Sequence, residues 1–409
     1  MPAHMVSLIN SVKAAHTRHQ KRHTPTGLQF ALSDTVELLN QSVWDGLTRT
    51  QSVFMQRPFL QLMEASGPDN VQMRYALITE GGAPVAAVVA QSVFVDGPRL
   101  IKGRSSNAVS AAFRKAIHGP LAQWQERLLV CGNLITFGQH AVATAPQGTR
   151  PVWPAVAEAI YRIRRADGLS GESDFIMVKD LDPHSAGGAK ELRTFSFREV
   201  ETDPNMVLAI RPSWKTYDDY LESLNTKYRK VARGLQKDVE KAGCTVENLT
   251  VTDAASEEMH NLYMQVHEKA AIRLFTLRPD FQARMAETFG KDFRCTAVRR
   301  DGRIVAFVTT VKDGDTAVGF HVGFDRELNE EAPLYFRMLQ AAVENAILLG
   351  CKRLSLGRTA LEPKAKLGAR PQPMSVWVRH RVPAMNLMVR ALLGTLEFDD
   401  APERNVFKT

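Results

Sequence analysis

The sequence predicts an α/β protein with two tandem domains, each built as a mixed sheet flanked by helices. Three observations lead to this prediction. The chain has 409 residues, which is enough for two domains that each bury a core. Its apolar content of 44% and charged content of 23% are those of a globular protein. The order of helical and strand patterns in the first half also recurs in the second half.

The first half of the sequence reads as one α/β unit. Its hydrophobic periodicity switches between the helical and the strand type, and Gly81-Gly82 marks a hairpin turn. The expected segments are helices within 35–63, hairpin strands 73–78 and 84–95, a helix ending near 126, a strand 128–137, a helix 155–165 and a strand 175–178.

The second half repeats this order around a hairpin with the turn Asp301-Gly302. The expected segments are helices 217–241, 257–272 and 280–289, strands 296–300, 304–311 and 316–323, a helix 333–349 and a strand 354–356. The two hairpins align, because Gly82 matches Gly302 and the Val-Ala pair at 85–86 matches the pair at 305–306.

These matches indicate an architectural repeat of about 220 residues. We expect a basic leader at residues 1–26, a first domain at 27–200 and a second domain at 201–409. The boundary between the domains is placed near residues 201–204.

The leader is strongly basic, since residues 1–33 contain no acidic residue. An organelle-targeting leader, a phosphate-binding arm and a frayed basic terminus all fit this composition. The spacing of His16, His19 and His23 resembles a metal-ligand set. A terminal tail lacks the surrounding partners that orient such ligands, so we predict no metal site.

Overall charge and cysteine content narrow the class of protein. The net charge of +8 and the pI near 9.3 allow an anionic partner, although many proteins carry such a charge without using it. The four cysteines form no CxxC pair, which indicates free thiols in a reducing compartment. Because no apolar run is long enough to span a bilayer, we expect a cytoplasmic protein without a transmembrane segment.

The best candidate site follows the strand at 354–356. Together with the strand at 316–323 and the helix between them, this strand forms a crossover unit, and ligands gather where the strands of such units end. Gly357 permits a sharp exit from the strand. The loop that follows carries Arg358, Lys364 and Lys366, and three cations between two glycines predict contact with an anionic ligand.

A second basic feature is the helical pattern at 224–244. Asn225 is placed to cap its start and Gly243 to end it. The residues expected on its buried face are Tyr228, Val231, Ala232, Leu235, Val239 and Ala242, and those on the opposite face are Lys227, Lys230, Arg233, Lys237 and Lys241. This cationic face is either a polyanion-binding stripe or an ordinary solvated face.

His321 lies on the strand that opens the crossover unit, where a histidine can act as a general base near neutral pH. The alternative is a hydrogen-bonded core residue. Asp280 is expected to cap a helix rather than to act as an acid. The sequence contains no GxGxxG after a strand, no Walker A motif, no HExxH and no GxSxG, which argues against dehydrogenase, P-loop NTPase, zinc protease and serine hydrolase functions.

The combined pattern resembles the GNAT superfamily, specifically its two-domain Fem-like branch. The residues that carry the resemblance are the stretch Ser213 to Leu221, Tyr228-Arg229-Lys230 in the basic helix, the Asp301-Gly302 hairpin, and Leu356-Gly357-Arg358 followed by Lys364 and Gly368. The resemblance implies two tandem GNAT-like domains, of which residues 27–200 are a degenerate first copy.

The resemblance also implies an acyltransferase that moves an acyl group from a thioester to an amine, forming an amide. Arg358 and Lys364 match positions expected to meet the donor or the developing charge, and Tyr228, Arg229, Lys230 and Lys366 are candidate donor or substrate contacts. The co-substrate would be acyl-CoA or an acyl-carrier thioester, with no permanently bound cofactor. The acceptor would be a small-molecule or peptide amine, and a tRNA or a carrier protein is a possible partner.

One stretch departs from the GNAT pattern. GNAT enzymes seat the coenzyme A pyrophosphate on a glycine-rich loop at a helix N-terminus, whereas residues 325–333 here contain no glycine and include Glu330 and Glu331. The donor is therefore bound differently or is not free coenzyme A. This leaves three hypotheses: a thioester-dependent N-acyltransferase, an aminoacyl-tRNA-dependent transferase of the Fem type, and a non-catalytic protein that binds a small anion or a protein.

Overall fold

The fold is described from a computed structural model of the whole chain. The structure describes residues 20, 24–96, 125–146, 151–182, 188–270, 273–383, 385–386 and 402–408. Most of the basic leader, with His16, His19 and His23, lies outside these residues, as does the helix expected before residue 126.

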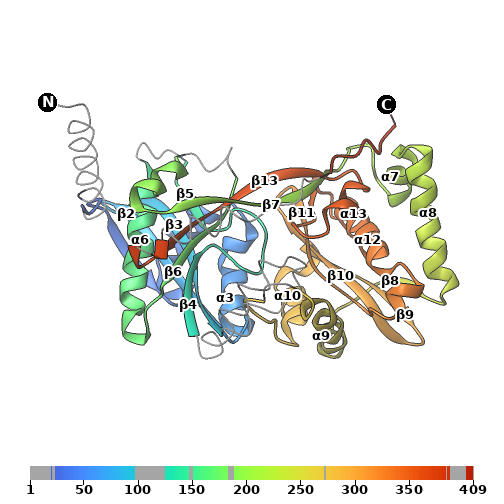
Figure 1. The fold of residues 1–409 in the computed structure, drawn as a ribbon, viewed down its shortest axis with the longest axis horizontal. Coiled ribbons are helices and arrows are strands. Elements are labelled where there is room, and N and C mark those ends of the chain that lie inside the picture. Colours follow the sequence, from blue (N-terminus) through green and yellow to red (C-terminus); the bar gives the residue numbers. More distant parts are fainter. Residues whose placement is uncertain are drawn as a thin grey trace.

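The first half of the chain folds as a sheet with helices on both faces (Figure 1). Its helices are α2 (Gln41–Thr48), α3 (Arg57–Ser66) and α6 (Val152–Asp167), with short 3-10 turns η1 (Val36–Leu38), η2 (Val53–Met55), η3 (Gly168–Ser170) and η4 (Ala189–Phe195). Its strands are β1 (Gln29–Ser33), β2 (Val71–Glu80), β3 (Ala83–Asp96), β4 (Gln125–Cys131), β5 (Val142–Thr144), β6 (Phe175–Leu181) and β7 (Arg198–Ala209).

The second half has the same architecture. Its helices are α7 (Tyr217–Ser223), α8 (Thr226–Lys241), α9 (Asp253–His267), α10 (Phe281–Phe289), α11 (Leu328–Glu331), α12 (Leu334–Leu348) and α13 (Leu361–Ala365), with the turn η5 (Gly290–Asp292). Its strands are β8 (Thr245–Asn248), β9 (Phe293–Arg300), β10 (Arg303–Asp313), β11 (Thr316–Phe324), β12 (Arg353–Ser355) and β13 (Arg370–His380). The predicted two-domain mixed-sheet fold is confirmed.

Local sequence explains why these elements begin and turn where they do. The turns Gly81-Gly82 and Asp301-Gly302 all adopt positive φ, as tight hairpins require. The Asn225 side chain accepts a hydrogen bond from the backbone N–H of Tyr228 and caps α8 as expected. Asp280 stands at the N-cap position of α10, but its side chain makes no capping hydrogen bond.

The described strands form one continuous sheet in the order β1-β2-β3-β4-β6-β13-β7-β12-β11-β10-β9-β8, with β5 beside β3. The two crossover units are parallel pairs: β4 with β6 around α6, and β11 with β12 around α12. In both units the helix follows the first strand and leads into the second, so the predicted repeat is present in the fold.

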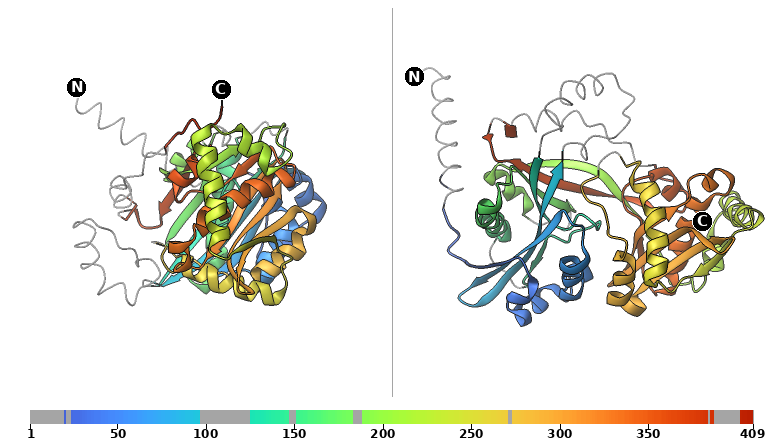
Figure 2. Two further views of the ribbon diagram at one scale, coloured as in Figure 1. Left: turned by 90° about the vertical axis from the view of Figure 1, so that its right-hand side faces the viewer. Right: turned by 90° about the horizontal axis from the view of Figure 1, so that it is seen from below.

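The two halves exchange their last strands. β7 follows the first-half strand β6 in the chain but pairs with β12 of the second half, while β13 ends the second half and pairs with β6 of the first. β7 and β13 also pair with each other, and both run from one lobe to the other (Figures 1 and 2). The predicted domain boundary at 201–204 falls within β7, so the chain changes lobes along a paired strand.

The halves also share a hydrophobic core. α6 covers one face of the first-half sheet, and α12 with α8 covers one face of the second. On the other face, α3 of the first half packs against α10 of the second. Phe54 stacks on Phe320 across this contact with ring centroids 5.5 Å apart.

Three local expectations are corrected. The strand expected at 128–137 ends at Cys131, because the chain turns at Asn133. The Asn133 side-chain oxygen accepts a hydrogen bond from the backbone N–H of Ile135 in this turn. The helical pattern at 217–241 is two helices, α7 and α8, separated at Leu224. Val231 is 55% exposed, since the packed side of α8 is narrower than the hydrophobic pattern suggested.

Among helices in the described part of the chain, none has the length and apolar character needed to cross a lipid bilayer.

The strand exchange predicts that a residue of β13 stabilises the first half. Trp377 on β13 is fully buried in the first-half core beside α6. Trp377→Ala should lower the free energy of unfolding by about 3–5 kcal/mol in urea denaturation, because it leaves a large cavity. Hydrogen exchange should accelerate first in α6 and β6. The control is Val382→Ala, because Val382 is exposed and its truncation leaves no cavity. If hydrogen exchange in Trp377→Ala accelerated only in the second half, Trp377 would not stabilise the first half.

Candidate functional site at the end of strand β12

The parallel pair β11–β12 opens at its carboxyl end. Only three residue pairs join the strands, the last being Val318 with Ser355, while β11 continues to Phe324. The chain leaves β12 through Gly357, which has a φ of 75°, as the sequence predicted. The carboxyl ends of parallel strands are where α/β proteins bind ligands. Arg358 and Lys364 follow at this end.

The exit from β12 is held from the neighbouring strand β7. The side-chain oxygen of Asn205 accepts hydrogen bonds from Ser355 Oγ and from the backbone N–H of Gly357, each at 3.0 Å. Phe137 of the first half lies against Gly357, where a Cβ atom would come within 3.1 Å of its ring. The backbone is thus fixed by residues from both halves.

Arg358 pairs with a carboxylate of the first half. Its half-buried guanidinium forms an ion pair with the buried Asp180, which also forms an ion pair with the ammonium group of Lys179. Lys179 further donates to the backbone carbonyl of Thr136 at 2.7 Å, and the backbone N–H of Gly138 donates to Asp180 at 3.2 Å. We call Arg358, Asp180 and Lys179 the interdomain charge cluster.

The interdomain charge cluster carries more positive than negative charge. Asp180 is fully buried and serves two cations, while the ring of Phe137 lies 5.5 Å from Lys179 Nζ and 5.9 Å from Arg358 Cζ. Burial lowers the pKa of Lys179, and Asp180 opposes that shift. Arg358 Nε is buried with no hydrogen-bond partner in the described structure. An arrangement of this kind attracts anionic groups.

Sequence reasoning missed Asp180 and Lys179. Their equivalent positions in the two crossover units could have indicated them. The last residue of β6 paired with β4 is Val178, and Asp180 lies two residues after it. In the same way, the last residue of β12 paired with β11 is Ser355, and Gly357 lies two residues after it. Both residues have positive φ, 58° for Asp180 and 75° for Gly357. Aspartate tolerates this conformation better than most residues, so a carboxylate replaces the expected glycine.

Lys364 is the most unusual charged side chain at the strand end. It lies on α13, is 3% exposed, and its ammonium group makes no hydrogen bond or ion pair with any residue that the structure describes. Burial lowers its pKa to about 8. The turn after α13 is held by the Tyr220 hydroxyl, which donates to the carbonyl of Leu367 at 3.1 Å. At neutral pH Lys364 is therefore a buried cation.

The other predicted contacts are placed differently. Lys366 is exposed and lies 3.7 Å from Glu362 in an ion pair. Arg229 donates to Glu222 at 2.6 Å, Tyr228 is partly buried, and Lys230 is exposed. Tyr228, Arg229 and Lys230 all lie on α8, which Figure 1 shows at the outer end of the second half. Arg358, in contrast, is paired with Asp180 of the first half.

His321 lies on the part of β11 beyond the β12 pairing. Gln282 Nε2 lies 3.0 Å from its Nδ1, and the rings of Tyr263, Phe281 and Phe320 surround it. Burial lowers its pKa to about 3, so the ring is neutral at physiological pH. With Gln282 donating to Nδ1, the ring proton stands on Nε2. These contacts favour the hydrogen-bonded alternative over a general base, and the catalytic role stays a prediction.

The N-terminus of α12 does not suit a pyrophosphate. Its cap is Pro333, which has no N–H, and the side-chain oxygen of Asn329 accepts from the backbone N–H of Tyr335 at 2.9 Å. Glu330 and Glu331 line the adjoining cavity of about 510 Å³. One backbone N–H that would hold phosphate is therefore occupied, another is missing at Pro333, and the local charge is negative.

Comparison with known proteins identifies the fold and one domain. Residues 226–365 match the family model of the acetyltransferase (GNAT) domain. A tandem GNAT protein from the clavulanic acid biosynthesis pathway is similar in structure, with a TM-score of 0.50 and 11% identity over 87% of this chain and 99% of that one. FemX is similar with a TM-score of 0.52 and 9% identity over 86% of this chain and 98% of FemX. A comparison with curated protein sequences found no match.

The interdomain charge cluster predicts a strong coupling between its members. Asp180→Asn keeps the shape and suits the positive φ, but leaves the buried Lys179 and the half-buried Arg358 without a carboxylate, so the free energy of unfolding should fall by about 3–5 kcal/mol. Arg358→Met in the same chain should restore part of this loss. Urea denaturation of the wild type, both single variants and the double variant measures the coupling, expected at about 1–3 kcal/mol. Additive effects would show that the two residues do not interact.

Proposed function

Because residues 226–365 form an acetyltransferase (GNAT) domain in a chain with the fold of tandem GNAT proteins and FemX, we propose that the protein transfers an acyl group from a thioester to an amine. The product is an amide. The observation that carries the proposal is Lys364, a buried lysine without a partner in the described structure, at the open end of a parallel strand pair.

The reaction needs a positive charge where the donor carbonyl becomes an oxyanion. The amine nitrogen attacks the carbonyl carbon of the thioester, the carbon–sulfur bond breaks, and the thiolate leaves while the amine loses a proton. Lys364 is protonated at neutral pH, and burial strengthens its interaction with charge on the carbonyl oxygen. We assign it to the oxyanion. Holding the two reactants side by side supplies much of the remaining acceleration.

Arg358 is proposed to bind an anionic part of a substrate. Asp180 fixes one terminal nitrogen of its guanidinium, and Nε is buried without a hydrogen bond among the described residues. A fixed guanidinium recognises a carboxylate or phosphate with little loss of side-chain entropy. The acceptor is then a small-molecule or peptide amine.

The donor is proposed to be an acyl-CoA or an acyl-carrier thioester. The acidic, capped N-terminus of α12 supports a donor whose phosphates lie elsewhere, as a carrier-bound thioester allows. The four cysteines are free and buried, which fits a reducing compartment, and we propose the cytoplasm.

An aminoacyl-tRNA donor is the second candidate. The observation that favours it is the face of α8, where Lys227, Lys230, Arg233, Lys237 and Lys241 are all exposed. Of these, Arg233 is paired with Glu222 at 2.8 Å. A stripe of this kind contacts a phosphate backbone, and binding then weakens steeply as salt rises.

The role of Lys364 predicts opposite effects on activity and stability. Lys364→Met should reduce amide formation at least about 100-fold, the usual effect of removing an oxyanion contact. It should raise the free energy of unfolding at pH 7 by up to about 3 kcal/mol, since the folded pKa of about 8 lies below 10.5 and the charged form is disfavoured by burial. That gain should shrink above pH 8.

The measurement is product formation from acetyl-CoA, longer acyl-CoAs, acylated carrier protein and aminoacyl-tRNA with a panel of amines, together with urea denaturation. Lys366→Met, an exposed lysine two residues away, is the matched control and should change neither quantity much. Full activity in Lys364→Met would reject the proposed role. Turnover with aminoacyl-tRNA alone would select the second candidate.

The pH dependence gives an independent prediction. As the pH rises through about 8, Lys364 loses its proton, so kcat should fall on the alkaline side with an apparent pKa near 8. In Lys364→Arg the charge persists to much higher pH, and this alkaline decline should disappear. An unchanged alkaline limb in that variant would assign the decline to another group.

A further inference from the structure

The outer face of α8 carries positive charge that the fold itself does not use. Lys227, Lys230 and Lys237 lie along this face, are exposed, and make no hydrogen bond or ion pair with any residue that the structure describes. The opposite side of α8 packs on α12 through Ala232 and Val239. The left view of Figure 2 shows α8 as the yellow-green helix at the outside of the second half. We call the three lysines the α8 lysine row.

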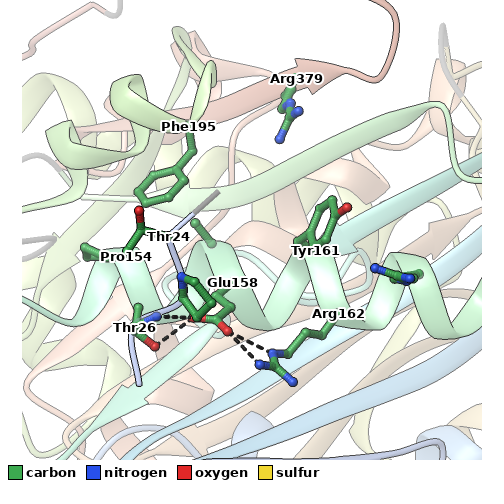
Figure 3. A pocket seen from close by; sticks show the side chains of 11 residues that line it. Thr24, Thr26, Pro154, Glu158, Tyr161, Arg162, Phe195 and Arg379 are labelled. Carbon is green, nitrogen blue, oxygen red and sulfur yellow. Dashed lines mark hydrogen bonds and ion pairs between the residues drawn. The ribbon is translucent and has the colours of Figure 1, made fainter. Parts of the chain in front are cut away.

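Other charged side chains on the outer helices are paired within the chain. Figure 3 shows Glu158 of α6 bound to Arg162, at 2.8 Å, and to Thr26. On α8 itself, Arg233 is paired with Glu222 in the same way, at 2.8 Å. Such pairs satisfy both charges inside the protein. The α8 lysine row instead leaves three positive charges that a partner outside the chain can neutralise.

A glycine lies in the middle of the row. Gly234 is one helical turn from both Lys230 and Lys237 and shares their face. A glycine inside a helix makes the helix less stable than alanine would. A Cβ atom at Gly234 would meet no other atom within 4 Å, so packing inside the chain does not require this glycine. Its effect is to let another backbone approach α8 closely between the lysines.

The groups that border the row distinguish between two kinds of anionic partner. Val231 is 55% exposed and lies one turn from Lys227, and the exposed acids Asp238 and Glu240 stand on the two sides of the row. A phosphate backbone gains nothing from the valine and is repelled by the two acids. A protein interface uses an apolar contact among charges of both signs. The face therefore favours an acidic protein over RNA.

The start of α8 is joined to the segment that carries Lys364. The backbone N–H of Asn225 donates to the carbonyl of Val406 at 2.9 Å, and the ring of the next residue, Phe407, lies against Gly368. Gly368 ends the turn after α13, where its backbone N–H donates to a carbonyl of that helix. A partner on α8 is thus held beside the strand-end site, and a flexible arm can bring a thioester to it.

We infer that the α8 lysine row, with Gly234 and Val231, is the docking face for a small acidic protein, the acyl carrier that presents the thioester donor. An acidic helix of the carrier lies along α8, its carboxylates meet the three lysines, and its backbone passes over Gly234. The inference rests on the proposed acyl transfer for the role of the partner, whereas the contact itself involves no chemical step. The acidic N-terminus of α12 agrees with a donor that a protein delivers.

Fluorescence anisotropy tests the docking. The probe is the labelled apo form of the acyl carrier protein of fatty acid synthesis from the same organism, titrated with the full chain. The apo form carries no thioester, so binding is measured without acyl transfer. Lys230→Glu combined with Lys237→Glu should weaken binding at least about tenfold, because two attractive contacts become repulsive. The matched control combines Lys190→Glu with Lys291→Glu, which changes the net charge equally at exposed lysines outside α8, and should bind normally.

Gly234→Gln separates docking from stability. Glutamine is a better helix former than glycine and meets no neighbour here, so the melting temperature should rise. Its side chain occupies the space that the partner needs, so carrier binding should weaken at least about tenfold. A glycine with a purely structural role would not produce both effects. Circular dichroism of each variant establishes that the fold is intact.

Three results would overturn the inference. The first is wild-type protein that leaves the anisotropy of the carrier unchanged. The second is an equal loss of binding in the control pair, which would show a response to overall charge. The third is tRNA that binds more tightly than the carrier and is weakened by the two substitutions in the row, which would assign the row to RNA.

Turnover of an acyl-pantetheine, a thioester without a protein, tests the proposed function separately. Carrier binding without turnover of either acyl-pantetheine or acylated carrier would reject acyl transfer and keep the docking face. Turnover of acyl-pantetheine without carrier binding would keep acyl transfer and reject the docking face.

Discussion

The pairing of β7 with β13 is the constraint on which the rest of the structure depends. Each strand continues one half of the chain and completes the sheet of the other. Two domains linked by a flexible segment would change their relative position freely. Here the backbone hydrogen bonds of both strands, and the core shared by α3 and α10, fix the halves as one unit. A site assembled from both halves can therefore have defined geometry.

The charged groups at the junction depend on that rigidity. Placing Lys179 and the half-buried Arg358 around the single carboxylate of Asp180 costs free energy, because each charge loses hydration. A mobile interface would relax and let water reach these groups. Held at the ends of β6 and β12, Lys179 and Arg358 stay poorly solvated and interact strongly with any negative charge that enters. Such costs are typical of binding and catalytic sites rather than of structural ones.

The two halves use equivalent positions in different ways. Beyond the last parallel pair, the second half has Gly357, whereas the first half has Asp180 in the same left-handed region. The glycine allows Phe137 to pack against the backbone, and the aspartate provides the counter-charge for Arg358. A repeated architecture has thus diverged into two complementary parts of one junction, and the first half contributes directly to the candidate site.

The sequence by itself determined the α/β class, the repeat, both hairpins and the crossover that ends at Gly357, because these follow from local periodicity and turn chemistry. It also selected Arg358 and Lys364, since a basic loop after a buried strand is a local pattern. Only the tertiary structure decided the strand exchange, the partner of Arg358 and the burial of Lys364. Asp180 and Arg358 are 178 residues apart, and no local pattern encodes a contact of that range. Likewise, the exposure of Val231 and the packing around His321 depend on which helices cover them, which is a property of the assembled sheet.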